Sequence, residues 1–239
     1  MTTKTLNISE EQLVDYSKAH NEPSWMTELR KKALKLTETL EMPKPDKTKL
    51  RKWDFDTFKQ HHTTGDAYTQ LTDLPKSVKE IIDVENSENL IIQHNNELAY
   101  TQVSDQAKHD GVIIEGLSEA LVNHSDLVQK YFMTKAVDVD EHRLTALHTA
   151  LVNGGIFVYV PKNTVVEHPI QYVVLHDDEQ ASFYNHVIIV TEESAEVTYV
   201  ENYLSTTSGE DNQLNIVSEV IAGANSNVTY GSVDYLDKG

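Results

Sequence analysis

Three segments in the last third of the chain repeat at a fixed spacing of 31 residues, and this spacing restricts the fold more than any other feature. Three sets of residues are in phase: Val166, Val197 and Val228; Val158, Ile189 and Val220; and the turn residues Asn163, Ser194 and Asn225. Such a period is typical of a solenoid, whose coils stack because none can bury its apolar face alone. No helical period follows Ile156, so we expect a parallel β-helix. An antiparallel meander of hairpins remains the alternative.

The first of these segments, residues 160–171, contains a pair of residues that could carry chemistry. Pro161 and Pro169 flank Glu167 and His168. Proline lacks the N–H that a sheet ladder needs, so it is tolerated where no ladder bond forms. We therefore interpret the segment as a corner between two strands. The alternative is a metal or acid–base site built from the carboxylate and the imidazole.

The first 60 residues are predicted to be helical. Ser9 followed by Gln12 forms a capping box, and the helix that starts there ends before Pro23. We expect Ser24 to cap a second helix that Pro43 ends. An apolar stripe follows one face of this helix: Trp25, Leu29, Ala33, Leu36 and Leu40. The opposite face is assigned the charged residues Arg30, Lys31, Lys35 and Glu38.

Residues 61–155 are predicted to mix helices and strands. We expect a short helix near residues 77–82, a hairpin that turns at residues 94–96, and a strand at residues 111–117. Two helices should follow, within residues 118–132 and 140–152, with Gly154–Gly155 ending the second. Upstream, Trp53, Phe55 and Phe58 form an aromatic cluster that should pin the helical unit to its neighbour.

Composition excludes several classes of function. The chain has no cysteine, so it carries no disulfide, no cysteine-ligated zinc and no thiol nucleophile. Residues 1–60 hold 12 basic against 10 acidic residues, and the remainder 8 against 28. Because this acidic body repels phosphate backbones, we expect no nucleic-acid partner. We find neither a signal peptide nor an apolar run near the roughly 18 residues of a membrane span, so we expect a cytoplasmic protein with no membrane contact.

No catalytic motif stands out. The phosphate-binding pattern G-x-x-x-x-G-K-[ST] is absent, and the acidic run His176–Glu179 suits a solvated turn better than an ion site. A β-helix carbohydrate enzyme, a lyase or hydrolase, would gather carboxylates on one face of its coils. Instead, the 31-residue alignment places Glu167 opposite Thr198 and Thr229, and Glu201 opposite Ile170 and Ser232.

Four segments, taken in order, resemble the SufB/SufD family of iron–sulfur cluster assembly proteins. They are EPSWMTELRKKALKLTETL (22–40), DKTKLRKWDF (46–55), VPKNTVVEHPIQ (160–171) and EESAEVTYVENY (192–203). The first two are more similar to the SufD branch, and the third is shared by both branches. The resemblance covers essentially the whole chain, and it implies a helical N-terminal unit followed by a right-handed parallel β-helix.

The resemblance also implies a function. In the SUF system, SufB, SufD and the ATPase SufC form a complex that assembles nascent clusters. SufD pairs with SufB through the β-helices and contacts SufC through a C-terminal helical segment. Family members extend well beyond 239 residues, so we expect this β-helix to be truncated before its C-terminal coils. The family's SufC-docking helices, and the histidine it places near the cluster site, have no counterpart here.

We therefore expect an α+β chain with an N-terminal helical unit (1–60), a mixed α/β connector region (61–155) and the first coils of a β-helix (156–239). The expected function is a non-enzymatic scaffold subunit that works with SufB and SufC, with the carbohydrate enzyme as alternative. We assign no catalytic, cofactor-binding or metal residue, and leave the iron–sulfur cluster to the parent complex. The uncovered last coil, around residues 213–221 and 227–235, should form a homodimer.

Overall fold

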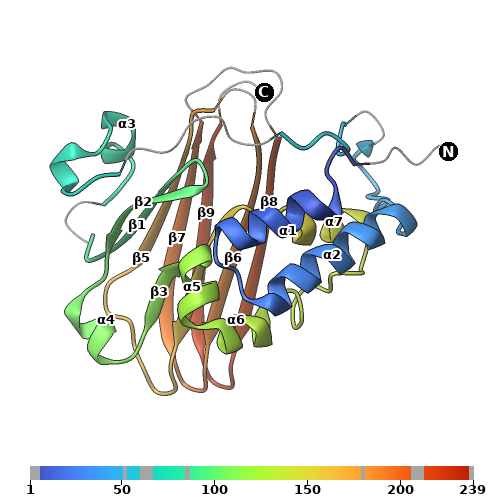
Figure 1. The fold of residues 1–239 in the computed structure, drawn as a ribbon. Coiled ribbons are helices and arrows are strands. Elements are labelled where there is room, and N and C mark those ends of the chain that lie inside the picture. The colour runs from blue at the N-terminus through green and yellow to red at the C-terminus, as the bar shows by residue number, and fades with distance from the viewer. Residues whose placement is uncertain are drawn as a thin grey trace.

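Two β-sheets face each other, and most of the helices cover the outer side of one of them (Figure 1). The computed structural model describes residues 6–50, 53–59, 67–83, 87–178, 181–205 and 213–236. The chain is thus an α+β protein in which helices precede sheets rich in parallel strands. Among the described residues, no helix is long and apolar enough to cross a lipid bilayer.

The N-terminal helices pack against a later helix, α7. The three helices are α1 (Glu10–Ala19), α2 (Ser24–Thr39) and α7 (Arg143–Leu151). The predicted capping box is confirmed, because the Ser9 hydroxyl accepts the Gln12 N–H while the Gln12 side chain accepts the Ser9 N–H. The predicted Ser24 cap is wrong: Pro23 holds the cap position without a side-chain bond, and Ser24 is the first helical residue.

The predicted division of α2 into an apolar and a charged face is wrong at Arg30. It is buried at 2% exposure, in line with Met26, Ala33 and Thr37, although it was assigned to the charged face. Its guanidinium donates to both carboxylate oxygens of Glu22, at 2.6 and 2.8 Å, and to the backbone carbonyls of Ala150 and Val152. An arginine can be buried when acceptors pair with its guanidinium N–H groups. A hydropathy pattern does not contain this information, because the acceptors come from other parts of the chain.

The nine strands found among the described residues form a five-stranded and a four-stranded sheet. The five-stranded sheet has the order β2-β1-β5-β7-β9, with β1 Asn89–His94, β2 Glu97–Gln102, β5 Ile170–His176, β7 Glu196–Ser205 and β9 Asn227–Tyr235. The four-stranded sheet has the order β3-β4-β6-β8, with β3 Ile113–Gly116, β4 Gly154–Val160, β6 Ser182–Thr191 and β8 Gln213–Ala222. The predicted hairpin is confirmed as the antiparallel pair β1–β2.

From β4 onward the chain alternates between the two sheets, and from β6 onward each strand pairs in parallel with the strand two places earlier. Val158, Ile189 and Val220 are in register, as are Val197 and Val228. The 31-residue repeat is therefore the pairing register of the sheets. The ladders between β4 and β9 are parallel, so the antiparallel meander is wrong.

The register differs at one corner. Ile170 pairs with Tyr199, an offset of 29 residues, whereas Val165 bridges Glu196 at the usual 31. The first corner thus holds two extra residues, around Pro169, where no ladder bond is needed. The predicted partner of Glu201 in the previous coil is therefore wrong: Glu201 pairs with Tyr172, and only its predicted pairing with Ser232 holds. Glu167 lies in the corner between the Val165 bridge and the ladder that begins at Ile170, so it is not in a described ladder with Thr198.

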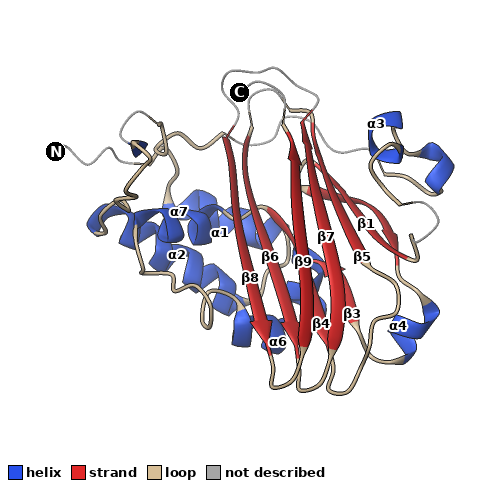
Figure 2. Ribbon diagram, turned by 180° about the vertical axis from the view of Figure 1, so that it is seen from behind, coloured by secondary structure: helices blue, strands red, loops and turns tan. Residues whose placement is uncertain are grey.

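The three in-phase turn residues share a left-handed backbone conformation, which the repeat by itself does not predict. Asn163, Ser194 and Asn225 have φ values of 60°, 58° and 56°, in the left-handed region. The turns stack, because the Asn163 N–H donates to the Glu193 carbonyl and the Ser194 N–H to the Ala224 carbonyl. Figure 2 shows the turns side by side at one end of the sheets.

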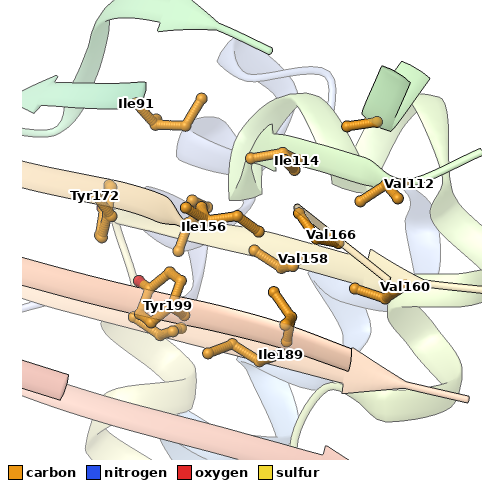
Figure 3. Close-up of a cluster of buried hydrophobic side chains, with 14 of the residues drawn as sticks. Ile91, Val112, Ile114, Ile156, Val158, Val160, Val166, Tyr172, Ile189 and Tyr199 are labelled. Carbon is orange, nitrogen blue, oxygen red and sulfur yellow. The ribbon is translucent and has the colours of Figure 1, made fainter. Parts of the chain in front are cut away.

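Apolar side chains fill the space between the sheets (Figure 3). They include Ile91 of β1, Ile156 and Val158 of β4, Tyr172 of β5, Ile189 of β6 and Tyr199 of β7. Each strand contributes alternate residues to this core, as expected for a period of two. The stacked valines and isoleucines therefore bury the face that a single coil would leave exposed.

Short helices cover the outer faces of the sheets. Helices α5 (Leu117–Asn123) and α6 (Ser125–Tyr131) pack on the four-stranded sheet, and α3 (Lys76–Lys79) packs over β1 beside the 3₁₀ turn Leu71–Asp73. Helix α4 (Asp105–His109) was not predicted, and the single helix expected at residues 118–132 is two. Of the aromatic cluster, Phe55 and Phe58 pack against the helical unit, while Trp53 is exposed and stacks on Phe55.

Gly154–Gly155 do not stop a helix. Helix α7 ends at Leu151, and the two glycines open strand β4. Gly155 has φ 144°, and a Cβ at this position would overlap the carbonyl oxygen of His186. Close approach of two strands, rather than helix termination, explains glycine at this position.

Candidate functional site

Strands β8 and β9 form the outermost edges of the two sheets, at the same end of the molecule. Within the described part of the chain, each pairs with only one neighbour, β6 and β7 respectively. Their outer edges therefore carry backbone N–H and C=O groups without a ladder partner. Such an edge readily pairs with another strand, and natural proteins usually cover or charge it.

Side chains at this end are exposed although their register partners are buried. Val220 is 38% exposed, whereas Ile189, one coil earlier, is 0% exposed. Tyr230 is 39% exposed, whereas its partner Tyr199 is fully buried. Because each pair occupies the same position in successive coils, the difference arises where no described strand packs over β8 and β9. Further exposed apolar residues at this end are Val233, Tyr235 and Leu236.

A carboxylate lies just inside the open end. The Tyr230 hydroxyl donates to Glu201 Oε1 at 2.5 Å, and the Tyr199 hydroxyl donates to Oε2 at 3.0 Å. Burial raises the pKa of Glu201, while the two hydroxyl donors oppose that rise. Burial and the nearby carboxylate raise the pKa of Tyr230 to about 12. The open end is therefore a mixed surface, with an apolar rim around a tyrosine-capped carboxylate.

The corner that contains Glu167 and His168 is anchored by its backbone. The His168 carbonyl accepts a hydrogen bond of 3.0 Å from Asn89 Nδ2, at the start of β1. Glu167 is exposed, and the His168 ring lies 3.6 Å from the carboxylate of Glu88. The two side chains thus belong to a turn between β4 and β5, as the corner interpretation predicts.

A buried polar cluster lies on the outer face of the four-stranded sheet, and the sequence analysis missed it. His148 of α7, His186 of β6 and Glu219 of β8 are each 0% exposed and lie in a row. The available signal was a glutamate and a histidine at outward positions of strands otherwise rich in β-branched residues. Without the pairing of β6 with β8, nothing connects them.

Metal binding finds no support among the described side chains. No three histidine, aspartate or glutamate residues there are grouped as metal ligands would be. His176 and Asp177 of the acidic run lie at the end of β5, where Asp177 accepts from Asn95 and lies 2.8 Å from His94 Nε2. Glu179, which ends the run, lies outside the described residues.

The carbohydrate-enzyme alternative needs carboxylates that stack in successive coils. Glu201 faces the inter-sheet space, but its register partners are Tyr172 and Ser232. The stacked positions that would carry an acid and a base therefore hold a phenol and a hydroxyl.

Comparison with known families agrees with the geometry. The model described as the SufBD protein N-terminal region matches residues 10–172, and the SUF system FeS cluster assembly, SufBD core domain model matches residues 173–239. The chain belongs to the SufBD family. The two matches meet close to the start of β5, so the core-domain match begins where the alternating strands stack.

Individual relatives refine this assignment. The chain is 48% identical to the iron–sulfur cluster assembly protein SufD of Bacillus subtilis, over 98% of this chain and 54% of that protein. It is 26% identical to SufBD family proteins of Staphylococcus epidermidis and Staphylococcus aureus, over 95% of this chain and 50% of each. The chain thus spans about half the length of these SufBD relatives, and its similarity to a SufD protein is the stronger.

Proposed function

We propose that this SufBD chain is a SufD-like scaffold subunit of the SUF system, which acts through protein contacts in the cytoplasm and performs no catalysis itself. Its partners would be SufB and the ATPase SufC. The nascent iron–sulfur cluster would be handled by the complex as a whole, with no cofactor resident in this chain. The similarity to SufD over almost the whole chain supports this proposal.

The open end made by β8 and β9 is the observation that carries the proposal. Its two edges are in register with the strands before them, and its apolar side chains are exposed where their partners one coil earlier are buried. Such a surface fits the next coil of a right-handed β-helix. In this proposal the stack built by β4 to β9 continues in the longer protein and presents its later coils to SufB.

Copurification tests the proposal. The full-length protein, coexpressed with tagged SufC and with SufB, should be retained with both at micromolar concentration. The 239-residue chain is the matched control. It spans about half the length of its SufBD relatives and would lack the C-terminal segment that is expected to contact SufC. We therefore expect this shorter chain to be lost in the wash. Failure of the full-length protein to associate with either partner would overturn the scaffold role.

The 239-residue chain should itself form a two-fold dimer through the same end. A self-complementary contact between exposed strands would cover the apolar rim on both copies. Val220→Lys, at the open end, should weaken the dimer, while Val122→Lys, which replaces an exposed valine on α5, should not. Sedimentation measures both variants, and a wild-type chain that stays monomeric at tens of micromolar would contradict the contact.

A further inference from the structure

The buried cluster on the outer face of the four-stranded sheet has no part in the open end, and its hydrogen atoms can be counted. His148 Nδ1 lies 2.7 Å from Asn215 Oδ1, His148 Nε2 lies 2.9 Å from His186 Nδ1, and His186 Nε2 lies 3.0 Å from Glu219 Oε1. Four side chains thus form one unbranched row. Each contact needs one donor and one acceptor.

Glu219 determines which side chain donates and which accepts in each hydrogen bond of the row. Its carboxylate accepts the backbone N–H of Met133 at 2.7 Å and that of Val137 at 3.1 Å. These residues lie in the connection between α6 and α7, where Met133 has a left-handed φ of 53°. A carboxylate only accepts, so His186 must donate from Nε2. The acid of an edge strand therefore holds a loop of the helical layer.

The remaining hydrogens follow from neutral rings. A neutral His186 that donates from Nε2 presents Nδ1 as an acceptor, so His148 must donate from its own Nε2. Nδ1 of His148 is then an acceptor, and Asn215 must turn its NH₂ group toward it. Rotating the amide exchanges Oδ1 and Nδ2, two groups of nearly equal size. Every contact in the row is then a good hydrogen bond.

Neutral rings suit the surroundings. Burial lowers the pKa of His148 well below its usual value, with His186 and Arg30 acting in the same direction. Burial also lowers the pKa of His186, against the opposing effect of Glu219. The groups that face the row are Arg30 of α2, already paired with Glu22, and Tyr184 and Phe132, whose rings pack beside His148 and His186. Within the row, the hydrogen bond with Asn215 raises the pKa of His148 and Glu219 raises that of His186, but burial outweighs both effects.

We propose that Asn215, His148, His186 and Glu219 form a one-directional hydrogen-bond chain that locks the α6–α7 connection onto β8 at neutral pH and releases it in acid. A proton added to either ring places a cation in a fully buried row, and once both rings are protonated the contact between His148 Nε2 and His186 Nδ1 becomes donor against donor. The open form, whose histidines have ordinary pKa values near 6.5, takes up that proton more readily. The lock is therefore complete above about pH 6.5 and weakens as the pH falls below it.

Imidazole nitrogen spectra of the ¹⁵N-labelled wild-type chain test the direction without any mutation. At pH 7.5 both His148 and His186 should be neutral and carry hydrogen on Nε2. A His148 ring protonated on Nδ1, or a doubly protonated His186, would overturn the proposal. Asn215→Asp replaces the donor by an acceptor and should switch His148 to the Nδ1–H or doubly protonated form. Asn227→Asp adds the same charge at an exposed site of β9 and should leave it unchanged.

Amide hydrogen exchange tests the lock. The protection factors of the Met133 and Val137 amides should fall by about tenfold per pH unit below pH 6 for each imidazole protonated. The amide of Val187, inside β6, should stay protected if the opening is local. Glu219→Gln should remove the protection of Met133 and Val137 at pH 7.5, whereas His109→Gln, an exposed site on α4, should not. Protection that is independent of pH between 7.5 and 5 would contradict the lock.

Discussion

The buried ion pair of Arg30 and Glu22 shows at the residue scale how helix α2 is joined to the end of helix α7. Burial by itself would raise the pKa of Glu22, but the adjacent guanidinium outweighs it and holds that pKa below its usual range. The same guanidinium donates to the carbonyls of Ala150 and Val152, just past the end of α7. Removing two charges from water costs free energy, and their mutual attraction offsets that cost only while both partners are present. Losing one partner of a buried pair therefore destabilises the fold.

Arg30→Met should destabilise the fold by about 3–5 kcal/mol, because it leaves the Glu22 carboxylate buried without its partner. Urea unfolding at pH 7 measures the loss. Since the pKa of Glu22 is lowered in the folded state, the contribution is present above its unfolded value of about 4.3 and is lost as the pH falls through the folded value.

The deficit of the Arg30→Met variant should therefore shrink in acid. Lys31→Met is the matched control, because Lys31 is paired with Glu28 and Glu10 at the surface, where solvent screens the charges, so its loss of stability should be much smaller. Equal losses in the two variants would contradict the assigned role of Arg30.

At the scale of elements, the coil is the unit that repeats. The turns at Asn163, Ser194 and Asn225 all need a left-handed residue, and two of the three positions use asparagine, which tolerates this conformation better than most residues. Between the turns, alternate strand residues enter the inter-sheet core. A substitution can therefore act on the turn or on the packing, and the two have different signatures.

Ser194→Asn should keep or slightly raise stability, by up to about 1 kcal/mol, because it places the better left-handed residue in the middle turn. Ser194→Val should cost about 1–2 kcal/mol or more, since a β-branched side chain is strained at positive φ. Thermal unfolding compares the two. A tolerated valine would mean that the turn rearranges freely.

Val197→Asp should unfold the stack, with a loss above about 4 kcal/mol, because it buries an unpaired charge between the sheets. Thr198→Asp, one residue further on and half-buried on the outward side, should be much milder. Circular dichroism and solubility distinguish the outcomes. A folded, soluble Val197→Asp chain would show that this residue does not face the core.

At the scale of the whole molecule, a net charge of −18 acts against any association of two copies. The open end is apolar at its rim, so burial rather than charge attraction would drive a contact there. Repulsion between two such acidic bodies falls as salt shortens the screening distance, from about 30 Å at 0.01 M to about 8 Å at 0.15 M.

The proposed dimer should therefore tighten as the salt concentration rises over this range. Sedimentation at the two ionic strengths measures the change in the dissociation constant. A dimer that weakens with salt would instead be held by opposite charges, and the open end would not be its interface. Val220→Lys at both ionic strengths separates the two mechanisms.

Much of the architecture could be predicted because it follows from local chemistry or from periodicity. The Ser9–Gln12 capping box, the hairpin at residues 94–96 and the inward side of Val197 each depend on a few neighbouring residues. The 31-residue pairing register followed from the repeat, because stacked coils of equal length must align. The position of the exposed end at β8 and β9 also followed from the 31-residue repeat. Whether the stack winds as a right-handed β-helix stays a prediction.

Contacts between distant segments could not be predicted in this way. Arg30 is buried because carbonyls some 120 residues away accept its hydrogens, and Gly155 is required because a neighbouring strand passes too close for a Cβ. The two extra residues at the Pro169 corner shift the register locally without breaking the repeat, so counting in steps of 31 misplaced the partner of Glu201 in the previous coil. The row from Asn215 to Glu219 exists only once β6, β8 and α7 are packed together. Periodicity specifies which residues can stack, but polar groups find their partners only in three dimensions, where burial makes those partners obligatory.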